Sequence, residues 1–211
     1  MGIITTVIAG DANFKKYVDK AVAYSRNVGY EPVVYDLGGL GYGTPFDARV
    51  SPKVGAKIPS KPGIIMETLR NVAMNDYVVW IDADALIEDR IDEIMFDYDI
   101  GVTVRQRKQI ENSLPINAGI VFVRKTTAAI KFVEEWIKLC ETGVSDQQEL
   151  NKLCCVTTKD TDKTVIRNNV KIHVFPCKIY NNVYFAKKKV PHAKIKHYKS
   201  KLRHLWPEVK T

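Results

Sequence analysis

The chain has 211 residues, of which 45% are hydrophobic and 27% are charged. These values are ordinary for a soluble globular protein and exclude a disordered or fibrous chain. The length is sufficient for one domain with a sizeable core, so we expect a single domain over residues 1–211. No apolar run approaches the length of a membrane-spanning helix, and we therefore expect no transmembrane segment.

The formal net charge of +8 is concentrated at one end of the sequence. From Lys187 to the end there are nine Lys and Arg residues against one acidic residue, so the preceding residues are neutral overall. A basic segment of this kind can bind nucleic acid, an anionic membrane or a phosphorylated small molecule.

The spacing of the cysteines indicates whether the protein belongs to a reducing or an oxidising compartment. The four cysteines, at positions 140, 154, 155 and 177, form no Cys-x-x-Cys zinc spacing, and the chain contains no Asn-x-Ser/Thr glycosylation site. This usage favours a reducing compartment, and we expect a cytoplasmic protein.

The first half of the chain alternates between strand-like and helix-like patterns. Residues 3–9 predict a strand, residues 14–28 a helix that Gly29 ends, and residues 32–36 a second strand. Residues 37–60 are rich in Gly and Pro and predict a long loop. Ser60 is placed to cap a helix with Pro62 in its first turn, and this helix has Ile65, Leu69, Val72 and Ala73 on its inner face.

The stretch Tyr77 to Ile81, "YVVWI", is apolar on both faces and predicts a central strand of a covered sheet. Further strands are expected at residues 100–105, 119–124 and 171–175. Between the last two lies a helical stripe formed by Ile130, Val133, Ile137 and Cys140. Strands that alternate with helices predict an α/β fold with a largely parallel sheet and helices on both faces.

Asp82 and Asp84 follow the central strand directly, at the end where such sheets bind ligands. Two carboxylates this close indicate a bound cation. A calcium loop is excluded because Leu86 and Ile87 stand where an oxygen ligand and a glycine are needed. An aspartyl-phosphate phosphatase fits poorly, since Ala85 and Leu86 follow the acidic pair. The remaining interpretation is Mg²⁺ or Mn²⁺ that bridges the protein to a nucleotide diphosphate.

Several stretches together resemble one family. The segment "KPGIIMETLRNVAMNDYVVWIDADALI" is similar to the nucleotide-binding half of metal-dependent GT-A-fold glycosyltransferases. "NAGIVFVR" resembles their Asn-x-Gly strand, "SDQQELN" their Asp-Gln element, and "HYKSK" their late metal-binding histidine. Order and spacing match over nearly the whole chain. The similarity is greatest to retaining families, namely family 34 and the glycogenin-like enzymes, and to a chlorovirus-encoded glycosyltransferase domain.

The resemblance implies roles for the acidic pair and for the late basic segment. Asp82 and Asp84 would bind Mn²⁺ or Mg²⁺, directly or through the nucleotide ribose, and His197 would be a third ligand. Ala83, between the two acids, would belong to the residues that bind the donor nucleotide. Lys199 and Lys201 would pair with the diphosphate. The family has a Gly-containing motif after the histidine that this chain lacks, which leaves open which lysine acts. A surface position for His197 is the alternative.

The resemblance also implies a donor-binding surface. Basic residues at Lys61 and Arg70 would reach the diphosphate or the sugar, with a solvated helix face as the alternative for each. Ala9, Gly10 and Asp11 lie where relatives hold uracil. Phe14 would lie against the base or belong to the core.

Four further positions would surround the donor sugar. Asn117 and Gly119 would border it, Gly119 by allowing close approach of the backbone. Asp146 and Gln147 would lie near the anomeric carbon, where a carboxylate or amide oxygen stabilises an oxocarbenium-like transition state. An inverting enzyme would need a carboxylate base, and none stands out, so we expect retention.

Two other functions compete with this interpretation. A nucleic-acid or anionic-surface binding protein would use the basic segment together with Tyr184, Phe185, Tyr198 and Trp206, but it leaves the acidic residues unexplained. A nucleotidyltransferase would need a Gly-rich triphosphate motif that is missing.

We therefore expect a GT-A (nucleotide-diphospho-sugar transferase) fold and a glycosyltransferase that uses a UDP-sugar and Mn²⁺. The acceptor would be a glycan or glycoprotein, and no nucleic acid is expected as a partner. The sequence is also compatible with a place inside a longer polypeptide. If the viral resemblance holds, the acceptor would be a glycan on a virion glycoprotein, made in the host cytoplasm.

Overall fold

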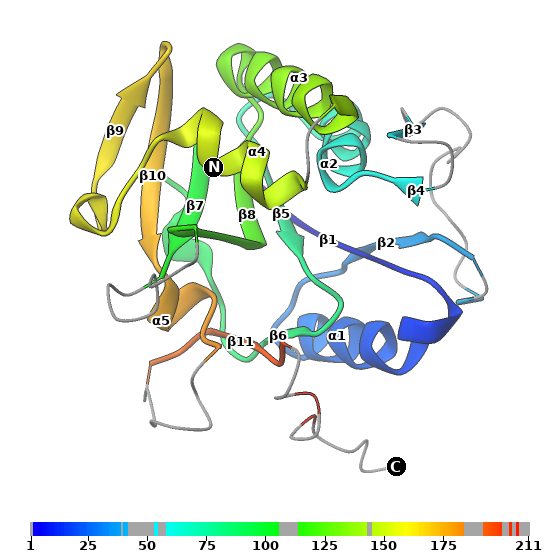
Figure 1. The fold of residues 1–211 in the computed structure, drawn as a ribbon. Coiled ribbons are helices and arrows are strands. Elements are labelled where there is room, and N and C mark those ends of the chain that lie inside the picture. Colours follow the sequence, from blue (N-terminus) through cyan, green and yellow to red (C-terminus); the bar gives the residue numbers. More distant parts are fainter. Residues whose placement is uncertain are drawn as a thin grey trace.

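A seven-stranded sheet forms the centre of the protein in the computed structural model, which describes residues 2–38, 40–41, 53–54, 58–105, 114–142, 145–183, 192–199, 203 and 206. Its strands lie in the order β2-β1-β5-β8-β7-β10-β9 (Figure 1). In chain order they are β1 (Ile4–Gly10), β2 (Val33–Asp36), β5 (Tyr77–Ile81), β7 (Ile100–Val104), β8 (Ile116–Arg124), β9 (Thr164–Arg167) and β10 (Val170–Pro176).

Two short strand pairs and a set of helices complete the described structure. The pairs are β3 (Lys53–Val54) with β4 (Ile58–Pro59), and β6 (Ala85–Ile87) with β11 (Ile195–His197). The α-helices are α1 (Lys15–Asn27), α2 (Lys61–Asn71), α3 (Thr127–Thr142), α4 (Asp146–Cys154) and α5 (Cys177–Tyr180). Short 3-10 turns are η1 (Ala12–Phe14), η4 (Asp92–Ile94) and η6 (Thr158–Asp160).

The strand directions confirm a mostly parallel sheet. Strands β2, β1, β5, β7 and β10 run the same way, while β8 and β9 run against them. Strand β8, which lies between β5 and β7, is antiparallel to both of these neighbours. Eleven residues separate β7 from β8, and this is too short a connection for the crossover helix that a parallel pair requires.

Two hydrophobic cores lie on opposite faces of the sheet. In Figure 1, α2, α3 and α4 lie on one side and α1 lies on the other. Along β5, Val78 and Trp80 pack into the core under α2 and α3, whereas Tyr77, Val79 and Ile81 pack into the core over α1. Every residue of β5 is buried, which confirms the predicted central strand and the helices on both faces.

Local sequence signals set several helix ends as predicted. The Ser60 side chain accepts a hydrogen bond from the Gly63 amide at 3.3 Å and so caps α2. Gly29 follows α1 with φ +88°, a conformation that glycine adopts without strain. The predicted inner face of α2 is only partly correct. The helix ends at Asn71, and Val72 just beyond it still packs against the same core. Ala73 is exposed, and its amide donates to the Asp76 carboxylate in a turn before β5.

Other differences from the sequence-based expectation concern short elements. Residues 37–60, expected to be a loop, contain the β3–β4 pair; residues 39, 42–52 and 55–57 lie outside the described part of the chain. The segment before β10 holds two helices, α3 and α4, where one was expected, because Ser145 caps a new helix by accepting from the Gln148 amide at 3.2 Å. All four cysteines are free thiols. Among the described residues, no helix is both long and apolar enough to cross a membrane.

Candidate active site

Asp82 and Asp84 lie in the tight turn that leaves the carboxyl end of β5. The Asp82 amide donates to the Gly119 carbonyl at 2.9 Å, which continues the β5–β8 pairing by one residue. The Ala85 amide then donates to the Asp82 carbonyl at 2.8 Å and closes the turn into β6. Ala83, between the two acids, is buried with 8% of its surface exposed. The turn therefore holds both carboxylates at the edge of the sheet.

His197 reaches this turn through the pairing of β11 with β6. Its register partner is Ala85, and the Tyr198 amide donates to the Asp84 carbonyl at 2.7 Å. The imidazole is buried, with 1% exposure. Residues separated by 113 positions are thereby brought into direct contact.

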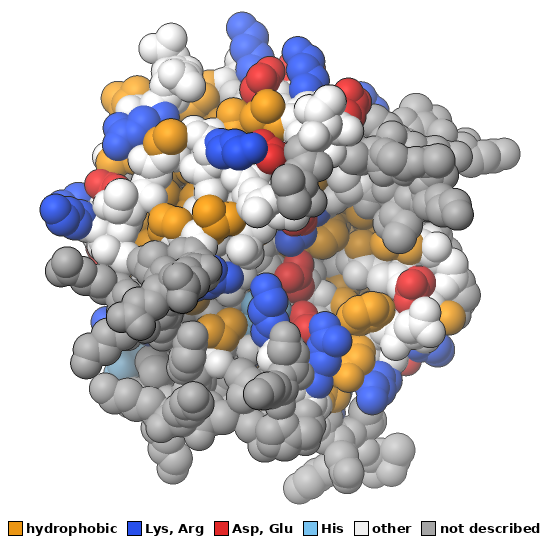
Figure 2. Space-filling model, in the orientation of Figure 1, with side chains coloured by type: hydrophobic (Ala, Val, Ile, Leu, Met, Phe, Trp, Pro, Cys, Tyr) orange, Lys and Arg blue, Asp and Glu red, His pale blue; other side chains and the backbone are white. Residues whose placement is uncertain are grey.

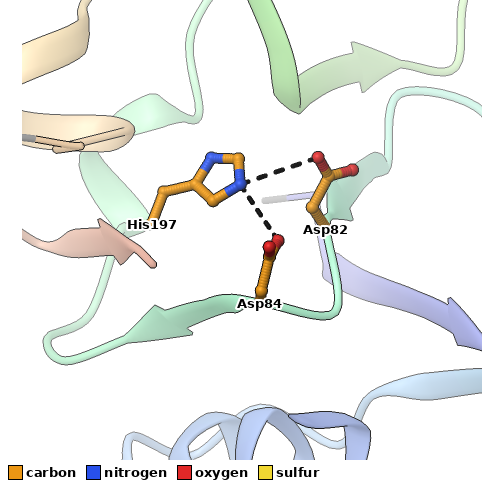
Figure 3. A group of neighbouring side chains, drawn as sticks. All are labelled: Asp82, Asp84 and His197. Atoms are coloured by element: carbon orange, nitrogen blue, oxygen red, sulfur yellow. Dashed lines mark hydrogen bonds and ion pairs between the residues drawn. The ribbon is translucent and has the colours of Figure 1, made fainter. Parts of the chain in front are cut away.

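One oxygen of each carboxylate faces the same imidazole nitrogen (Figure 3). His197 Nε2 lies 3.0 Å from Asp84 Oδ1 and 3.8 Å from Asp82 Oδ2. The possible ligand atoms of the three side chains all lie within 4.8 Å of one another. Two carboxylate oxygens and one imidazole nitrogen are ligands that suit Mn²⁺ or Mg²⁺.

Gly119 makes room for this imidazole. A Cβ at position 119 would lie 2.3 Å from His197 Cε1, 2.6 Å from His197 Nδ1 and 3.1 Å from Asp82 Oδ2. Any side chain there would therefore displace the histidine. The resemblance implied that Gly119 borders the sugar; its contacts place it directly behind the His197 ring.

The outer oxygens of the two acids are held by protein donors. Arg203 donates to Asp84 Oδ2 through Nε at 2.9 Å and Nη2 at 2.8 Å, and its guanidinium lies over the ring of Phe14. Trp80 Nε1 donates to Asp82 Oδ1 at 2.8 Å. Burial alone would raise the pKa of Asp84, but the hydrogen bonds and charges of His197 and Arg203 outweigh burial and lower that pKa well below its ordinary value.

Lys61, the first residue of α2, connects the acidic turn to α4. Its ammonium lies 3.1 Å from Asp82 Oδ1 and 3.3 Å from Asp146 Oδ2, and it donates to the Ala118 carbonyl at 2.6 Å. Burial would lower the pKa of Lys61, but the charges of Asp82 and Asp146 raise it. An ammonium has three N–H donors, and all three have acceptors here. Lys61 thus binds two carboxylates rather than an open surface.

Asn117, Asp146 and Gln147 lie on the two elements beside this lysine. The Asn117 side chain accepts from the Gly119 amide at 3.1 Å, and the residue is 1% exposed. The Gln147 Oε1 accepts from the Ala118 amide at 3.3 Å. The first turn of α4 therefore packs against the strand that carries Asn117, and the Asp146 side chain remains about one-third exposed.

The predicted nucleobase residues lie at the carboxyl end of β1. Asp11 caps η1 by accepting from the Asn13 amide at 2.9 Å. A Cβ on Gly10 would lie 2.7 Å from the Val18 side chain, so this glycine allows α1 to approach β1. Ala9 is half-buried beside the core under α2. Phe14 is also half-buried and packs against the core over α1, which matches the packing alternative considered for it.

Two predicted basic residues, Arg70 and Lys199, form no hydrogen bond or ion pair with the cluster in the described part of the chain. Arg70 lies at the far end of α2 from Lys61 and pairs with Glu67 at 2.9 Å. The two residues are nine positions apart in the helix, which corresponds to about 14 Å along its axis. Lys199 is exposed two residues beyond His197. Lys201 lies outside the described part of the chain.

Sequence reasoning missed Arg203, Asn181 and Trp80. Arg203 lies within the basic segment, where nothing distinguishes it from the neighbouring lysines. Asn181, whose Oδ1 lies 2.9 Å from His197 Nδ1, belongs to no motif that we recognised. Trp80 was assigned to the core, which is correct for its ring, but its N–H also binds Asp82.

The charges of the cluster fit a bound cation. Asp82, Asp84 and Asp146 carry three negative charges, while Lys61 and Arg203 carry two positive charges. Figure 2 shows acidic and basic side chains close together near the centre of the face that it displays. The donor set and the remaining negative charge both suit a divalent ion held by Asp82, Asp84 and His197.

Comparisons with known structures agree with this architecture. A glycosyltransferase involved in the glycosylation of the major capsid of PBCV-1 aligns over 96% of this chain and 97% of its own, with TM-score 0.59 and 14% identity. The galactosyltransferase LgtC, solved with donor and acceptor sugar analogs, aligns over 93% and 87%, with TM-score 0.54 and 15% identity.

The glycosyltransferase GlyE of Streptococcus pneumoniae TIGR4 aligns with TM-score 0.62 and 15% identity. The alignment covers 95% of this chain but 55% of GlyE, so this chain spans about half the length of that protein. At these identities the similarity establishes the fold. No curated protein sequence matches the chain.

The sequence itself establishes the family. Residues 66–204, more than half of the chain, match the family described as Nucleotide-diphospho-sugar transferase. The matched range begins within α2 and includes the Asp82–Asp84 turn, β8, α4 and His197. With the α/β architecture and the acidic cluster at the carboxyl end of β5, this protein belongs to the nucleotide-diphospho-sugar transferase family and has the GT-A glycosyltransferase fold.

Proposed function

We propose that this protein transfers a sugar from a UDP-sugar to a hydroxyl group of a glycan or glycoprotein, with Mn²⁺ or Mg²⁺ bound by Asp82, Asp84 and His197. The observation that carries the proposal is the convergence of these three side chains, with ligand atoms within 4.8 Å, at the carboxyl end of β5. That edge of an α/β sheet is where such folds bind their ligands.

A divalent ion at this position would neutralise the charge that develops on the departing diphosphate. Lys61 keeps Asp82 and Asp146 at fixed positions, since its ammonium contacts both carboxylates. The metal ligands and the residues near the sugar are therefore connected by one buried cation. This arrangement favours a preorganised site, in which little rearrangement is needed during the reaction.

We further propose that the configuration of the sugar is retained. Asp146 and Gln147, at the first turn of α4, are the groups that we assign to the vicinity of the anomeric carbon. Both are already hydrogen-bonded: Asp146 to Lys61, and Gln147 to the Ala118 amide. A carboxylate paired with the Lys61 ammonium suits stabilisation of positive charge at the sugar better than removal of a proton from an acceptor.

The acceptor and the compartment are inferred from the similar glycosyltransferase that is involved in the glycosylation of the major capsid of PBCV-1. By analogy, the acceptor here would be a glycan on a glycoprotein, and a viral protein of this kind would act in the host cytoplasm. The competing function, binding of nucleic acid or an anionic surface, rests on the basic segment after Lys187. This binding function gives no reason for the acidic cluster, and membership in the nucleotide-diphospho-sugar transferase family does not favour it.

The proposal is tested with a panel of nucleotide sugars. We expect hydrolysis and binding of a UDP-sugar that require Mn²⁺ or Mg²⁺ and stop on addition of EDTA. NMR of the anomeric proton of the product reports the stereochemistry, and an inverted product would refute retention. A preference for GDP- or CMP-sugars would refute the assignment of uridine, and metal-independent binding would refute the metal site.

A further inference from the structure

A cavity of about 230 Å³ lies at the carboxyl ends of β7 and β10, outside the acidic cluster. Val104 and Pro176, the last residues of these two strands, line it together with Cys177. The other lining residues are polar: Arg105, Thr158, Thr161, Asp162 and Lys178. Sites for drug-sized ligands have volumes of roughly 300–1,000 Å³. This cavity is smaller and suits a ligand such as one sugar unit.

The register of the sheet places this cavity near the expected sugar site. Val104 pairs with Ile116 on β8 and with Pro176 on β10, so the three residues form one row across the sheet. Asn117, which we expect to border the donor sugar, follows Ile116 directly. Neighbouring strands are about 4.8 Å apart, so β10 lies about 10 Å from β8 (Figure 1). A disaccharide spans this distance. An acceptor whose reacting hydroxyl lies beside Asn117 can therefore place its next sugar unit in the cavity.

The segment between α4 and β9 forms one side of the cavity and is held in place by the protein itself. Thr157 and Asp160 form a capping box around η6. The Asp162 amide donates to the Val174 carbonyl at 2.7 Å, and the Val174 amide donates to the Lys163 carbonyl at 2.9 Å. These hydrogen bonds tie the segment to β10. The lining is therefore formed before a ligand binds, as is usual for sites that bind small molecules.

The charged groups of the lining have capacity for a ligand. Within the described part of the chain, the side chains of Asp162 and Lys178 form no hydrogen bond or ion pair. Arg105 donates to the Leu114 carbonyl through Nη1 at 2.8 Å, which uses one of the five N–H donors of a guanidinium. Arg105 and Lys178 carry two positive charges and Asp162 carries one negative charge. The lining therefore has an excess of one positive charge, which suits an anionic group.

We propose that this cavity is a subsite for a sugar unit of the acceptor glycan that carries a carboxylate, such as a uronic acid. Arg105 and Lys178 bind the carboxylate, and the planar guanidinium matches its two oxygens. Asp162 accepts hydrogen bonds from the hydroxyl groups of the ring. This inference rests on the proposed function, because it assigns the acceptor of the same reaction.

A small inorganic anion fits the cavity less well than an acidic sugar. Phosphate would pair with Arg105 and Lys178, but it would also face the carboxylate of Asp162, and like charges repel. An acidic sugar offers hydroxyl donors to Asp162 and a carboxylate to the two basic residues. The mixed charge of the lining therefore favours a ligand that has both kinds of group.

The test uses methyl glucuronide and methyl glucoside, two probes that differ only in the carboxylate. Titrations followed by two-dimensional ¹H–¹⁵N NMR report both the affinity and the place of binding. We expect methyl glucuronide to shift the amide signals of Thr158, Asp162 and Lys178. It should bind more tightly than methyl glucoside and inorganic phosphate, by at least about fivefold, the upper range for one exposed ion pair.

Charge-removing variants identify the groups that bind the carboxylate. Arg105→Gln should weaken the binding of methyl glucuronide by roughly tenfold or more, the usual effect of losing a hydrogen bond to a charged group. Lys178 is exposed, so Lys178→Gln should weaken it by about two- to fivefold. Asp162→Asn should strengthen the binding of phosphate, because it removes a charge that repels anions. The matched control is Lys138→Gln on α3, which removes an exposed lysine that pairs with Glu135 and should change none of these affinities.

Disaccharides test whether the cavity is aligned with the transfer site. Two disaccharides are compared, with glucuronic acid at one end or at the other and glucose at the remaining position. At least one of them should shift the amide signals of Asn117 and Ala118 in addition to those of the cavity. Shifts that stay confined to the cavity for both disaccharides would overturn its role as an acceptor subsite.

Metal-dependent hydrolysis of a UDP-sugar by the wild type separates this inference from the proposed function. Hydrolysis without any shift of the cavity signals by methyl glucuronide would overturn the inference alone. Shifts of these signals without hydrolysis of any nucleotide sugar would refute the proposed function and leave a site for acidic sugars. Equal affinities for the two methyl glycosides would overturn the assignment of a carboxylate. If Arg105→Gln does not fold, an unchanged affinity for methyl glucuronide in Lys178→Gln overturns the inference, and a weaker affinity supports it.

Discussion

The chain contains the pattern Asp-x-Asp at Asp82–Asp84, at Asp97–Asp99 and at Asp160–Asp162. Neither acid of the third copy is buried, and the first two copies lie in opposite settings. The first copy follows the carboxyl end of β5, whereas the second precedes the amino end of β7. Both copies border strands of the same sheet, and each includes one buried acid, Asp84 at 5% exposure and Asp99 at 7%. Sequence pattern and burial alone do not distinguish them.

The partners of the carboxylates do distinguish them. Asp99 accepts hydrogen bonds from the Thr126 hydroxyl and from the Lys171 amide, and Asp97 pairs with Arg124 and Lys171. The hydrogen bond from Lys171 is the main reason that the pKa of Asp97 is lowered. Each of these partners is a donor, so the second pair has its charge satisfied by the protein itself.

At the first pair, one oxygen of each acid faces the same nitrogen of His197, and all three atoms are possible metal ligands. No such ligand faces the second pair in the described part of the chain, where the neighbours are a hydroxyl, an amide and two cationic side chains. The lesson is that an Asp-x-Asp pattern indicates a metal site only when the fold brings a further possible ligand, such as a histidine, to it.

The largest expected difference in Mn²⁺ affinity is between two variants, each of which replaces the buried acid of one of these two Asp-x-Asp patterns. Asp84→Asn should weaken Mn²⁺ binding by more than the roughly 10- to 100-fold that loss of an outer partner costs, because it removes a ligand. Asp99→Asn should leave Mn²⁺ affinity unchanged and instead lower the free energy of unfolding by about 1–3 kcal/mol, the cost of disrupting buried hydrogen bonds. Calorimetry and urea unfolding measure the two quantities. If both variants weakened Mn²⁺ binding equally, the two acidic patterns would not differ as metal-binding sites.

The next effect concerns the glycine beside each pair. Gly119→Ala places a Cβ 2.3 Å from His197 Cε1, so the imidazole must move, and we expect Mn²⁺ affinity to fall by at least tenfold, as for loss of an orienting partner. Gly101→Ala is the matched control, since its Cβ would lie 2.6 Å from the Phe175 ring and 2.9 Å from Phe122 Cβ. This overpacking should cost about 1–3 kcal/mol of stability. Wild-type Mn²⁺ affinity in Gly119→Ala would contradict the placement of His197.

A smaller effect is expected from the arginine that pairs with each acidic pattern. Arg203 binds the outer oxygen of Asp84 with its side chain 40% exposed, so its charge competes with a metal ion. Arg203→Ala should strengthen the binding of Mn²⁺ alone by about two- to fivefold, the range expected for a partly exposed ion pair. Arg124→Ala, which breaks the ion pair with Asp97, should not change the affinity for Mn²⁺. Weaker Mn²⁺ binding in Arg203→Ala would show that the arginine supports the ion rather than competing with it.

The smallest effect is expected at Arg70, which the resemblance placed near the donor. Its contact is an exposed pair with Glu67 on the same helix, and such pairs contribute less than about 1 kcal/mol. Arg70→Ala should leave donor affinity within about twofold of wild type when measured by calorimetry with a UDP-sugar and Mn²⁺. A loss of tenfold or more would show that this end of α2 reaches the donor.

Much of the architecture could be predicted from the sequence because its signals are local. The unbroken apolar run of β5 indicated a strand covered on both faces, and Ser60 indicated the start of α2. Asp82 and Asp84 could be placed at the carboxyl end of β5 because they follow it directly along the chain. The β6–β11 pair could not be predicted, since strands of three residues carry no usable periodicity.

By itself, then, the sequence determined the α/β alternation, the central strand and the acidic turn that follows it, because side-chain periodicity and helix caps act over a few residues. Only the tertiary structure decided which Asp-x-Asp pattern meets a histidine and which meets donors. It also decided that Arg203 and Asn181 take part and that Arg70 does not. These contacts join residues up to 119 positions apart. They depend on strand order and register, which arise from packing the whole sheet between its two cores.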